Sequence, residues 1–302
     1  MVETYREAPL DMEKVFKVLV NGIKEYFGKY GIKNAVLGLS GGIDSTVVAA
    51  LCKAANIPLL GLSLPCSSNA NVENDSALAA GKEFCDYFKV VNLQEPYEVM
   101  EKFCRNASNA DKTPISQGNI KARLRMITLY DMASKVGGLV MDTDNLTEHF
   151  LGFWTLHGDD ADFNPIGGLW KHEVYALARY MKENVFKESK ALEQAIALMP
   201  TDGNGVKEGG DLAQIAPGKT YDDVDEILYA WVGLDPRIKE HVLHNYFDYG
   251  VFKGLCEKHG YETVEAVIMR SVRSEFKRKQ RPFIIDVYRG LICEKDGKIL
   301  AS

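Results

Sequence analysis

The sequence predicts an α/β protein, a doubly wound parallel sheet with helices on both faces. The first observation is that short apolar runs alternate with amphipathic helical segments up to residue 141, a pattern typical of parallel sheets with crossover helices. The second is that polar clusters at 40–46 and 142–145 each follow an apolar run. Ligands of such sheets bind at the carboxyl ends of strands, so the two clusters are expected on one rim.

The first half of the chain supplies the predicted strands. An amphipathic helix is predicted over 11–28, and its apolar spacing ends near Gly28. The apolar runs that follow are predicted as four strands, at 35–39, 58–65, 89–93 and 138–141. The helices between them are predicted at 44–55, 72–87, 95–105 and 119–136.

The second half is predicted to be mainly helical. The predicted helices cover 171–182, 188–199, 221–231 and 236–258. Residues 201–219 are rich in glycine and polar residues and are predicted to form a long mobile loop, since long loops in compact domains are commonly lids or disordered segments. With no repeat and no clear linker, residues 1–302 are expected to form a single domain, which ends in a basic segment at 270–281.

Composition excludes several classes of protein. The chain has 302 residues, of which 46% are hydrophobic, and a net charge of −6, which argues against a general nucleic-acid binder. The first residues lack an apolar signal core, and no apolar run approaches the roughly 20 residues of a membrane span. None of the six cysteines forms a C-x-x-C pair, so a cytoplasmic protein with free thiols is expected and neither zinc nor iron–sulfur ligation is supported.

The most informative segment is 36–46, an apolar strand that runs into a Ser-Gly-Gly turn and then a helix. Paired glycines allow backbone amides to approach an anion closely, and the helix start adds its positive dipole end. Ser40, Ser45 and Thr46 add hydroxyl donors, and Asp44 is placed to hold a magnesium ion against phosphates. The spacing differs from the Walker pattern, so it predicts a pyrophosphate site rather than a kinase-like one. An ordinary serine-glycine turn is the alternative.

This Ser-Gly-Gly-Ile-Asp-Ser loop resembles that of the N-type ATP pyrophosphatases, and three further blocks extend the resemblance. The blocks are 117–126, then 142–148 with 152–159 and 164–171, then 200–201 with 219–225. Together they make the chain similar to the ammonia-dependent NAD+ synthetases from about residue 12 to 281. The resemblance implies an adenine-nucleotide alpha-hydrolase-like, Rossmann-like fold.

The resemblance also implies a C–N ligase reaction in two steps. The nicotinate carboxylate of deamido-NAD+ attacks the ATP α-phosphate, which gives an acyl-adenylate and pyrophosphate. Ammonia then attacks the acyl carbon and gives NAD+ and AMP. ATP as co-substrate, Mg2+, and a homodimer are implied, and no glutaminase domain is expected within the 302 residues.

Residues for ATP and the metal are carried over position by position. Asp44 and Glu148 match the magnesium ligands, and Lys171 matches a lysine that contacts the phosphates. The residues expected to bind ATP are Gly38, Leu39, Ser40, Gly41, Gly42, Ile43, Asp44, Ser45, Arg125, Thr143, Lys171 and Thr201. Thr201 could equally be a helix N-cap, and Lys171 and Glu148 could be solvated surface residues.

A second set matches positions that contact deamido-NAD+. This set is Asn119, Arg123, Asp162, Phe276 and Lys277. Asp162 is expected to orient ammonia or accept its proton, and it is grouped with Asp44, Asp159 and Lys171 as catalytic. Turn chemistry for Asp162, a surface charge for Arg123, and a frayed terminus for the basic segment are the alternatives.

Some positions depart from the family pattern. Leu156 and Phe276 replace a lysine and a histidine that touch the substrate in one branch, and Asp142 replaces a glycine. Asp142 could add a carboxylate to the site or face solvent. Two other functions stay open: an ATP pyrophosphatase that adenylates a different carboxylate or carbonyl, and a catalytically silent nucleotide-binding protein.

Overall fold

The sheet of four parallel strands is confirmed. A computed structural model describes residues 10–66, 71–108, 111–198, 212–244 and 250–278. The strands are β1 (Asn34–Gly38), β2 (Leu59–Ser63), β3 (Tyr87–Val90) and β4 (Gly138–Val140), in the order β3-β2-β1-β4. The third strand lies earlier than predicted, because the Asn92 side chain accepts a hydrogen bond from the Gln94 amide (2.9 Å) and turns the chain into the next helix.

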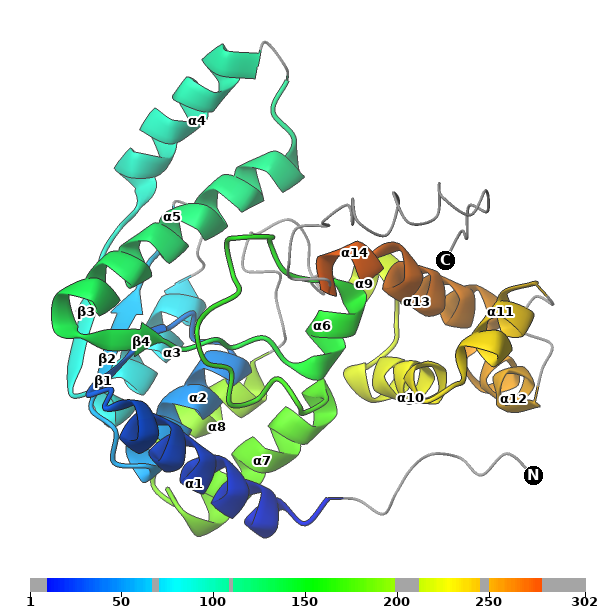
Figure 1. The fold of residues 1–302 in the computed structure, drawn as a ribbon, viewed down its shortest axis with the longest axis horizontal. Coiled ribbons are helices and arrows are strands. Elements are labelled where there is room, and N and C mark those ends of the chain that lie inside the picture. Colours follow the sequence, from blue (N-terminus) through cyan, green and yellow to red (C-terminus); the bar gives the residue numbers. More distant parts are fainter. Residues whose placement is uncertain (1–9, 67–70, 109–110, 199–211, 245–249, 279–302) are drawn as a thin grey trace, which may run out of the picture.

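Helices cover both faces of the sheet, as predicted (Figure 1). Along β1, Ala35 and Leu37 pack into one buried cluster and Val36 into another, as the two-residue period of a strand requires. One layer contains α1 (Met12–Tyr30), α2 (Ile43–Ala54), α3 (Asn71–Phe84), α7 (Lys171–Asn184) and α8 (Lys190–Ala197). The other contains α4 (Gln94–Ser108) and α5 (Pro114–Val136). α5 begins five residues earlier than predicted because Thr113 and Ser116 form a capping box with Pro114 in the first turn.

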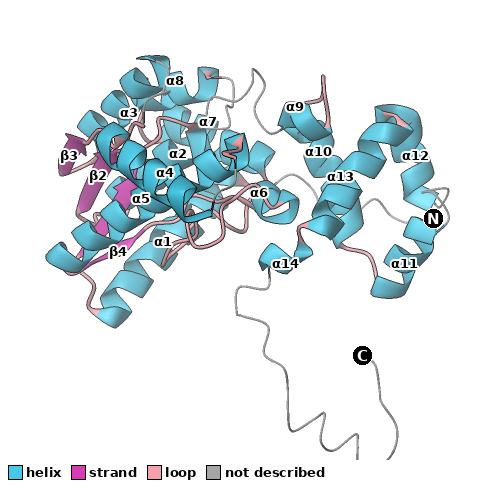
Figure 2. Cartoon of the chain, turned by 90° about the horizontal axis from the view of Figure 1, so that it is seen from above, coloured by secondary structure: helices cyan, strands magenta, loops and turns pink. Residues whose placement is uncertain are grey.

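A second hydrophobic core lies to one side of the sheet (Figure 2). It is built by short helices that pack around Trp170, Leu228 and Ile268. These helices are α6 (Leu146–Leu151), α9 (Leu212–Ile215), α10 (Tyr221–Val232), α11 (Pro236–His244), α12 (Gly250–His259) and α13 (Tyr261–Arg273). The short helix α14 (Glu275–Arg278) follows α13, and its residues are not among those of this core. Among the described residues, no helix is long and apolar enough to cross a bilayer.

Several boundaries in this second half differ from the sequence prediction. The helix predicted over 236–258 is two helices, α11 and α12, and α6, α13 and α14 were not predicted. The predicted loop 201–219 lies outside the described residues up to 211, and its later part includes the short helix α9. α6 is only six residues long, so it offers too few turns for a periodic pattern to be recognised.

Candidate active site

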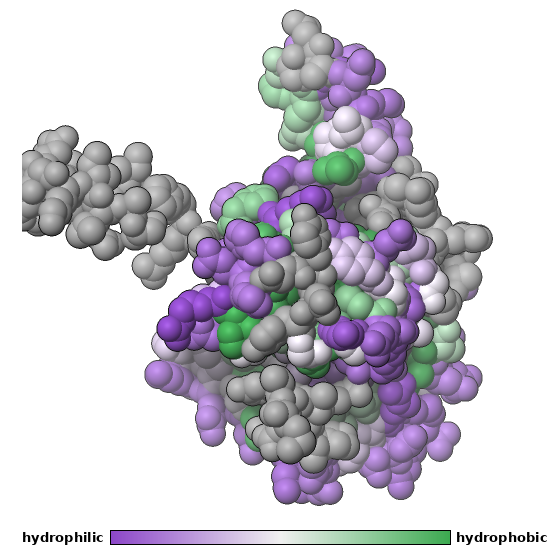
Figure 3. Space-filling model, turned by 90° about the vertical axis from the view of Figure 1, so that its right-hand side faces the viewer, coloured by the Kyte–Doolittle hydropathy of each residue, from purple (hydrophilic) through white to green (hydrophobic). Residues whose placement is uncertain are grey.

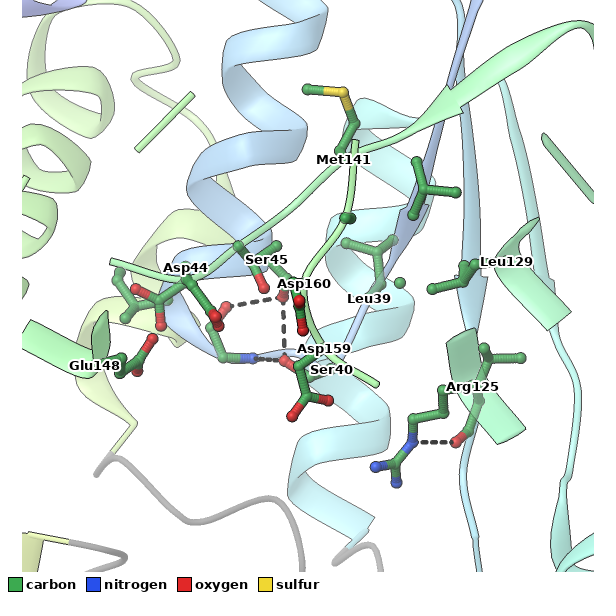
Figure 4. A pocket seen from close by; sticks show the side chains of 18 of the residues that line it. Leu39, Ser40, Asp44, Ser45, Arg125, Leu129, Met141, Glu148, Asp159 and Asp160 are labelled. Carbon is green, nitrogen blue, oxygen red and sulfur yellow. Dashed lines mark hydrogen bonds between the residues drawn. The ribbon is translucent and has the colours of Figure 1, made fainter. Parts of the chain in front are cut away.

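A cavity of about 370 Å³ opens at the carboxyl ends of β1 and β4, where the sequence placed both polar clusters. Asp44 and Glu148 lie at one end, Arg125 lies at the other, and Ser40, Asp159 and Asp160 lie between them (Figure 4). Ten of the residues predicted for ATP line it: Gly38, Leu39, Ser40, Gly42, Ile43, Asp44, Ser45, Arg125, Thr143 and Lys171. Gly41 belongs to the same loop without lining the cavity, and Thr201 lies outside the described residues.

The loop between β1 and α2 has the conformation that its glycines allow. Gly41 has φ +88°, a left-handed region that favours glycine. Gly42 is the N-cap of α2 and makes no side-chain cap hydrogen bond. The Ser40 Oγ accepts a hydrogen bond from the Gly42 amide (3.1 Å) and lies 3.2 Å from the Ser45 Oγ. The first turn of α2 therefore faces the cavity with its dipole and amides, as an anion site requires.

Thr46 does not contribute the hydroxyl donor that the sequence suggested. Its Oγ1 donates to the Gly42 carbonyl at 2.9 Å, and the residue is fully buried in the first turn of α2. Ser40 and Ser45 line the cavity, and Thr46 supports the loop from behind.

Lys171 is bound between the two carboxylates that the sequence assigned to a metal. Its Nζ donates to Asp44 Oδ2 at 2.5 Å and to Glu148 Oε1 at 3.0 Å, and Lys171 is only 4% exposed. The ammonium also lies 5.4 Å from the centre of the Tyr221 ring, within cation–π range. Burial raises the pKa of Glu148 to about 7, because the neighbouring Asp44 carboxylate adds to the shift and the Lys171 ammonium offsets only part of it.

The carboxylates fit a magnesium ion that arrives with phosphate. Among the described residues, no three acidic, histidine or cysteine side chains form a preformed metal site. Mg2+ is commonly held by only one or two carboxylates together with substrate phosphates. Asp44 and Glu148 meet that requirement: both line the cavity beside the open start of α2, and both already contact a cation.

Two further carboxylates line the cavity that the sequence analysis did not select. They belong to Asp144, four residues after the end of β4, and to Asp160. Burial and the neighbouring Asp142 raise the pKa of Asp144 well above its ordinary value. The signal for Asp144 was present in the sequence, because it lies in the same polar cluster as Thr143.

Asp142, which replaces a glycine of the family pattern, supports the loop. It is buried, and its carboxylate accepts hydrogen bonds from the amides of Asp144 (2.7 Å) and Ala161 (3.2 Å). The structure therefore answers the question that the sequence left open. The side chain neither faces solvent nor lines the cavity.

The residues predicted for deamido-NAD+ are not among those that line this cavity in the described part of the chain. Three of them contact the segment after α6. Asn119 Oδ1 accepts from the Thr155 hydroxyl (3.0 Å), Arg123 donates to the Leu156 carbonyl (3.1 Å), and Lys277 donates to the Gly152 carbonyl (2.7 Å).

The other two predicted contacts lie at the surface. Phe276 is 62% exposed on α14. Asp162 is exposed, and its oxygens accept hydrogen bonds from the Tyr130 hydroxyl (3.0 Å) and the Val140 amide (3.1 Å). Asp159, by contrast, lines the cavity and accepts from the Thr155 amide at 2.7 Å.

The basic segment holds the C-terminal end of α6. Arg270 donates to the Leu151 carbonyl (2.7 Å), Arg278 donates to the Phe150 carbonyl (2.9 Å), and Lys277 donates to the carbonyls of Gly152 and Trp154. Cations at a helix C-terminus are favoured by its dipole. Residues up to 278 are thus ordered against α6 rather than frayed, and 279–281 lie outside the described residues.

Comparison with known proteins agrees with this arrangement. The model of the NAD synthase family matches residues 15–281. The chain belongs to this family. It is 36% identical over 229 residues to an NH3-dependent NAD+ synthetase of Carboxydothermus hydrogenoformans, an alignment that covers 74% of this chain and 88% of the relative. It is 34% identical to one of Campylobacter jejuni, over 81% of this chain and 97% of the relative.

Solved structures of NAD synthases and related enzymes share the fold. The NH3-dependent NAD synthetase of Campylobacter jejuni aligns with a TM-score of 0.63 and 26% identity, over 92% of this chain and 100% of that one. The NMN synthetase of Francisella tularensis aligns with a TM-score of 0.71 over 92% and 99% of the two chains, but at 24% identity it supports the fold alone.

Proposed function

We propose that this NAD synthase family member uses ATP and ammonia to convert deamido-NAD+ to NAD+, with release of AMP and pyrophosphate. The observation that carries the proposal is the convergence of the β1–α2 loop, Thr143, Glu148 and Lys171 in one cavity. The curated relatives, most of whose length this chain spans, are NH3-dependent enzymes. This supports free ammonia as the nitrogen donor.

The cavity supplies what the adenylation step needs. The open N-terminus of α2 and the hydroxyls of Ser40 and Ser45 are positioned to bind the phosphates of ATP. The carboxylates of Asp44 and Glu148 would hold Mg2+, which neutralises charge on the leaving pyrophosphate. The Lys171 ammonium, which lies between these two carboxylates in the cavity, is placed to contact phosphate oxygens and to stabilise the charge that develops on them.

For the ammonia step we propose a carboxylate near the β4 end of the cavity. Asp162 was the sequence-based choice, and it remains a candidate although its oxygens bind Tyr130 and Val140. Asp159 is the better placed, because it lines the cavity. The two variants Asp159→Asn and Asp162→Asn separate these roles: the variant of the residue that handles ammonia should release pyrophosphate at the normal initial rate but capture ammonia more slowly.

We also propose that the enzyme is a homodimer. Val99, Phe103 and Ile115 are 66%, 69% and 77% exposed on α4 and α5. At the top of Figure 3, where α4 extends away from the rest of the molecule, hydrophobic residues lie along one side of the helix. A second copy is the commonest partner for such a face.

Two further predictions stay proposals. One is that residues 1–302 form a single domain, and the other is that the protein is cytoplasmic. The free thiols of the described cysteines support that location.

The deciding experiment measures pyrophosphate release and NAD+ formation in parallel, with Mg-ATP, deamido-NAD+ and ammonium. Equal amounts of the two products are expected. Pyrophosphate without NAD+ would contradict ammonia as the donor while leaving the adenylation step standing. If the folded protein binds ATP but forms neither pyrophosphate nor NAD+, deamido-NAD+ is contradicted as the acceptor. Xanthosine monophosphate then tests the alternative pyrophosphatase chemistry.

A further inference from the structure

A buried hydrogen-bond cluster lies directly behind the cavity, on residues to which the sequence analysis assigned no role of their own. Its centre is Asp225 on α10, which is 1% exposed. Asp225 accepts hydrogen bonds from the Thr147 hydroxyl on α6, from the His172 amide (3.0 Å) on α7, and from the His172 ring (Nδ1 to Oδ2, 2.8 Å). One carboxylate therefore joins three helices.

A further hydrogen bond connects the cluster to the backbone of Lys171. The Lys171 amide donates to the Thr147 Oγ1 at 2.9 Å, so the Thr147 hydroxyl accepts from α7 while it donates to Asp225. The first amides of a helix have no partner within the helix. Thr147 and Asp225 supply partners to the first two amides of α7 from other elements, and Trp170, its N-cap, makes no side-chain cap bond.

Each residue of the cluster is placed beside a residue of the cavity. Thr147 precedes Glu148, His172 follows Lys171, and Asp225 lies four residues after Tyr221, on the same face of α10. Glu148, Lys171 and Tyr221 all line the cavity, and Glu148 and Tyr221 both contact the Lys171 ammonium. A shift of α7 would move the ammonium relative to Asp44, and a shift of α6 or α10 would move Glu148 or Tyr221 relative to the ammonium.

We propose that Asp225 is a positioning residue that fixes Lys171 and Glu148 in the cavity by tying α6, α7 and α10 together through Thr147 and the first amides of α7. This inference deepens the proposed function and rests on it for the role of Lys171 toward phosphate. It assigns no contact with substrate to Asp225, which is fully enclosed by the three helices.

The test compares two variants of Thr147 that differ in one group. Thr147→Val removes the hydroxyl and keeps the shape, whereas Thr147→Ser keeps the hydroxyl. We expect Thr147→Val to lower kcat for NAD+ formation by about tenfold while KM for deamido-NAD+ changes less than about twofold. Thr147→Ser should restore most of kcat. Asp225→Asn should lower kcat at least as much as Thr147→Val.

Ser189→Ala is the matched control for stability. It removes a hydroxyl that is 6% exposed and caps α8 by accepting from the Leu192 amide (3.1 Å). We expect a similar loss of Tm from Ser189→Ala and Thr147→Val but a loss of kcat only from the latter. Equal kcat in Thr147→Val and Thr147→Ser, or a kcat loss that follows Tm in all variants, would overturn the positioning role.

Failure of this inference is separable from failure of the proposed function. Calorimetric titration with Mg-ATP alone needs no second substrate, and Thr147→Val should bind ATP about fivefold more weakly than Thr147→Ser. If the wild-type protein makes no NAD+ but this difference is found, the proposed function fails and the positioning role stands. Equal ATP affinities of the two variants contradict the positioning role whether or not NAD+ forms.

Discussion

The N-termini of α2 and α7 both meet the cavity, yet they are built in opposite ways. α2 begins after Gly42, without a side-chain cap. α7 begins with amides that already donate to Thr147 and Asp225. An open helix start is available to an anion, whereas a closed one holds its first side chain in place. α2 therefore offers backbone amides to the cavity beside the side chains of Asp44 and Ser45, whereas α7 offers the Lys171 ammonium.

The largest expected effect is at the closed start. If α7 acts through one ammonium, Lys171→Met should lower the rate of pyrophosphate release on the order of 10²–10³-fold, because a charge aimed at the transition state is lost. Initial rates under saturating ATP measure it. A loss below tenfold would contradict the inference that α7 acts through the Lys171 ammonium, since the backbone of α7 would then have to account for its part in catalysis. A Tm measurement on the variant excludes unfolding.

At the open start, the backbone itself is the target. Gly41→Ala places a side chain at φ +88°, and the strain should cost about 1–2 kcal/mol and distort the loop. We expect ATP affinity to fall at least tenfold in titration calorimetry. Gly137→Ala is the matched control: its φ is +62°, with open space at the Cβ, at the far end of α5. That variant should lose similar stability and keep ATP affinity; a parallel loss of affinity would refute the role of the α2 start.

The pair of carboxylates around Lys171 gives a pH dependence. The pKa of Glu148 is raised from 4.5 to about 7 in the folded protein. A raised carboxyl pKa means that stability present below pH 4.5 is lost as the pH rises through 7. Glu148→Gln should therefore gain unfolding free energy relative to the wild type at pH 8 compared with pH 5. Urea denaturation of the ligand-free proteins measures this, and an unchanged or opposite difference would contradict it.

The smallest expected effect concerns His172, in the first turn of α7. The hydrogen bond to Asp225 raises the pKa of His172 above its ordinary value of 6.5. Asp225→Asn removes the negative charge, so the NMR titration midpoint of the His172 ring should move to lower pH. The His172→Gln variant assigns the resonance among the six histidines. An unmoved midpoint would mean that His172 and Asp225 do not interact in solution.

Prediction from sequence succeeded where the signal is local. The four strands are short apolar runs, and the β1–α2 loop is marked by paired glycines and hydroxyl residues, so both were recognisable without knowledge of distant contacts. Seven of the ten ATP positions that line the cavity belong to this strand, loop and helix start, whereas Arg125, Thr143 and Lys171 were predicted from the family resemblance. Lys277 shows the limit: its charge was visible, but its bond to the Gly152 carbonyl joins residues 125 apart in sequence.

By itself, the sequence determined the sheet, the glycine turn and the identity of the charged groups, because periodicity and backbone freedom are properties of neighbouring residues. Only the tertiary structure decided which side chains bond directly to one another. Lys171 meets Asp44 across 127 positions, and Asp225 meets Thr147 across 78. Such pairs form because a buried charge or hydroxyl must find a partner wherever the packed helices bring one, and no local pattern encodes that partner.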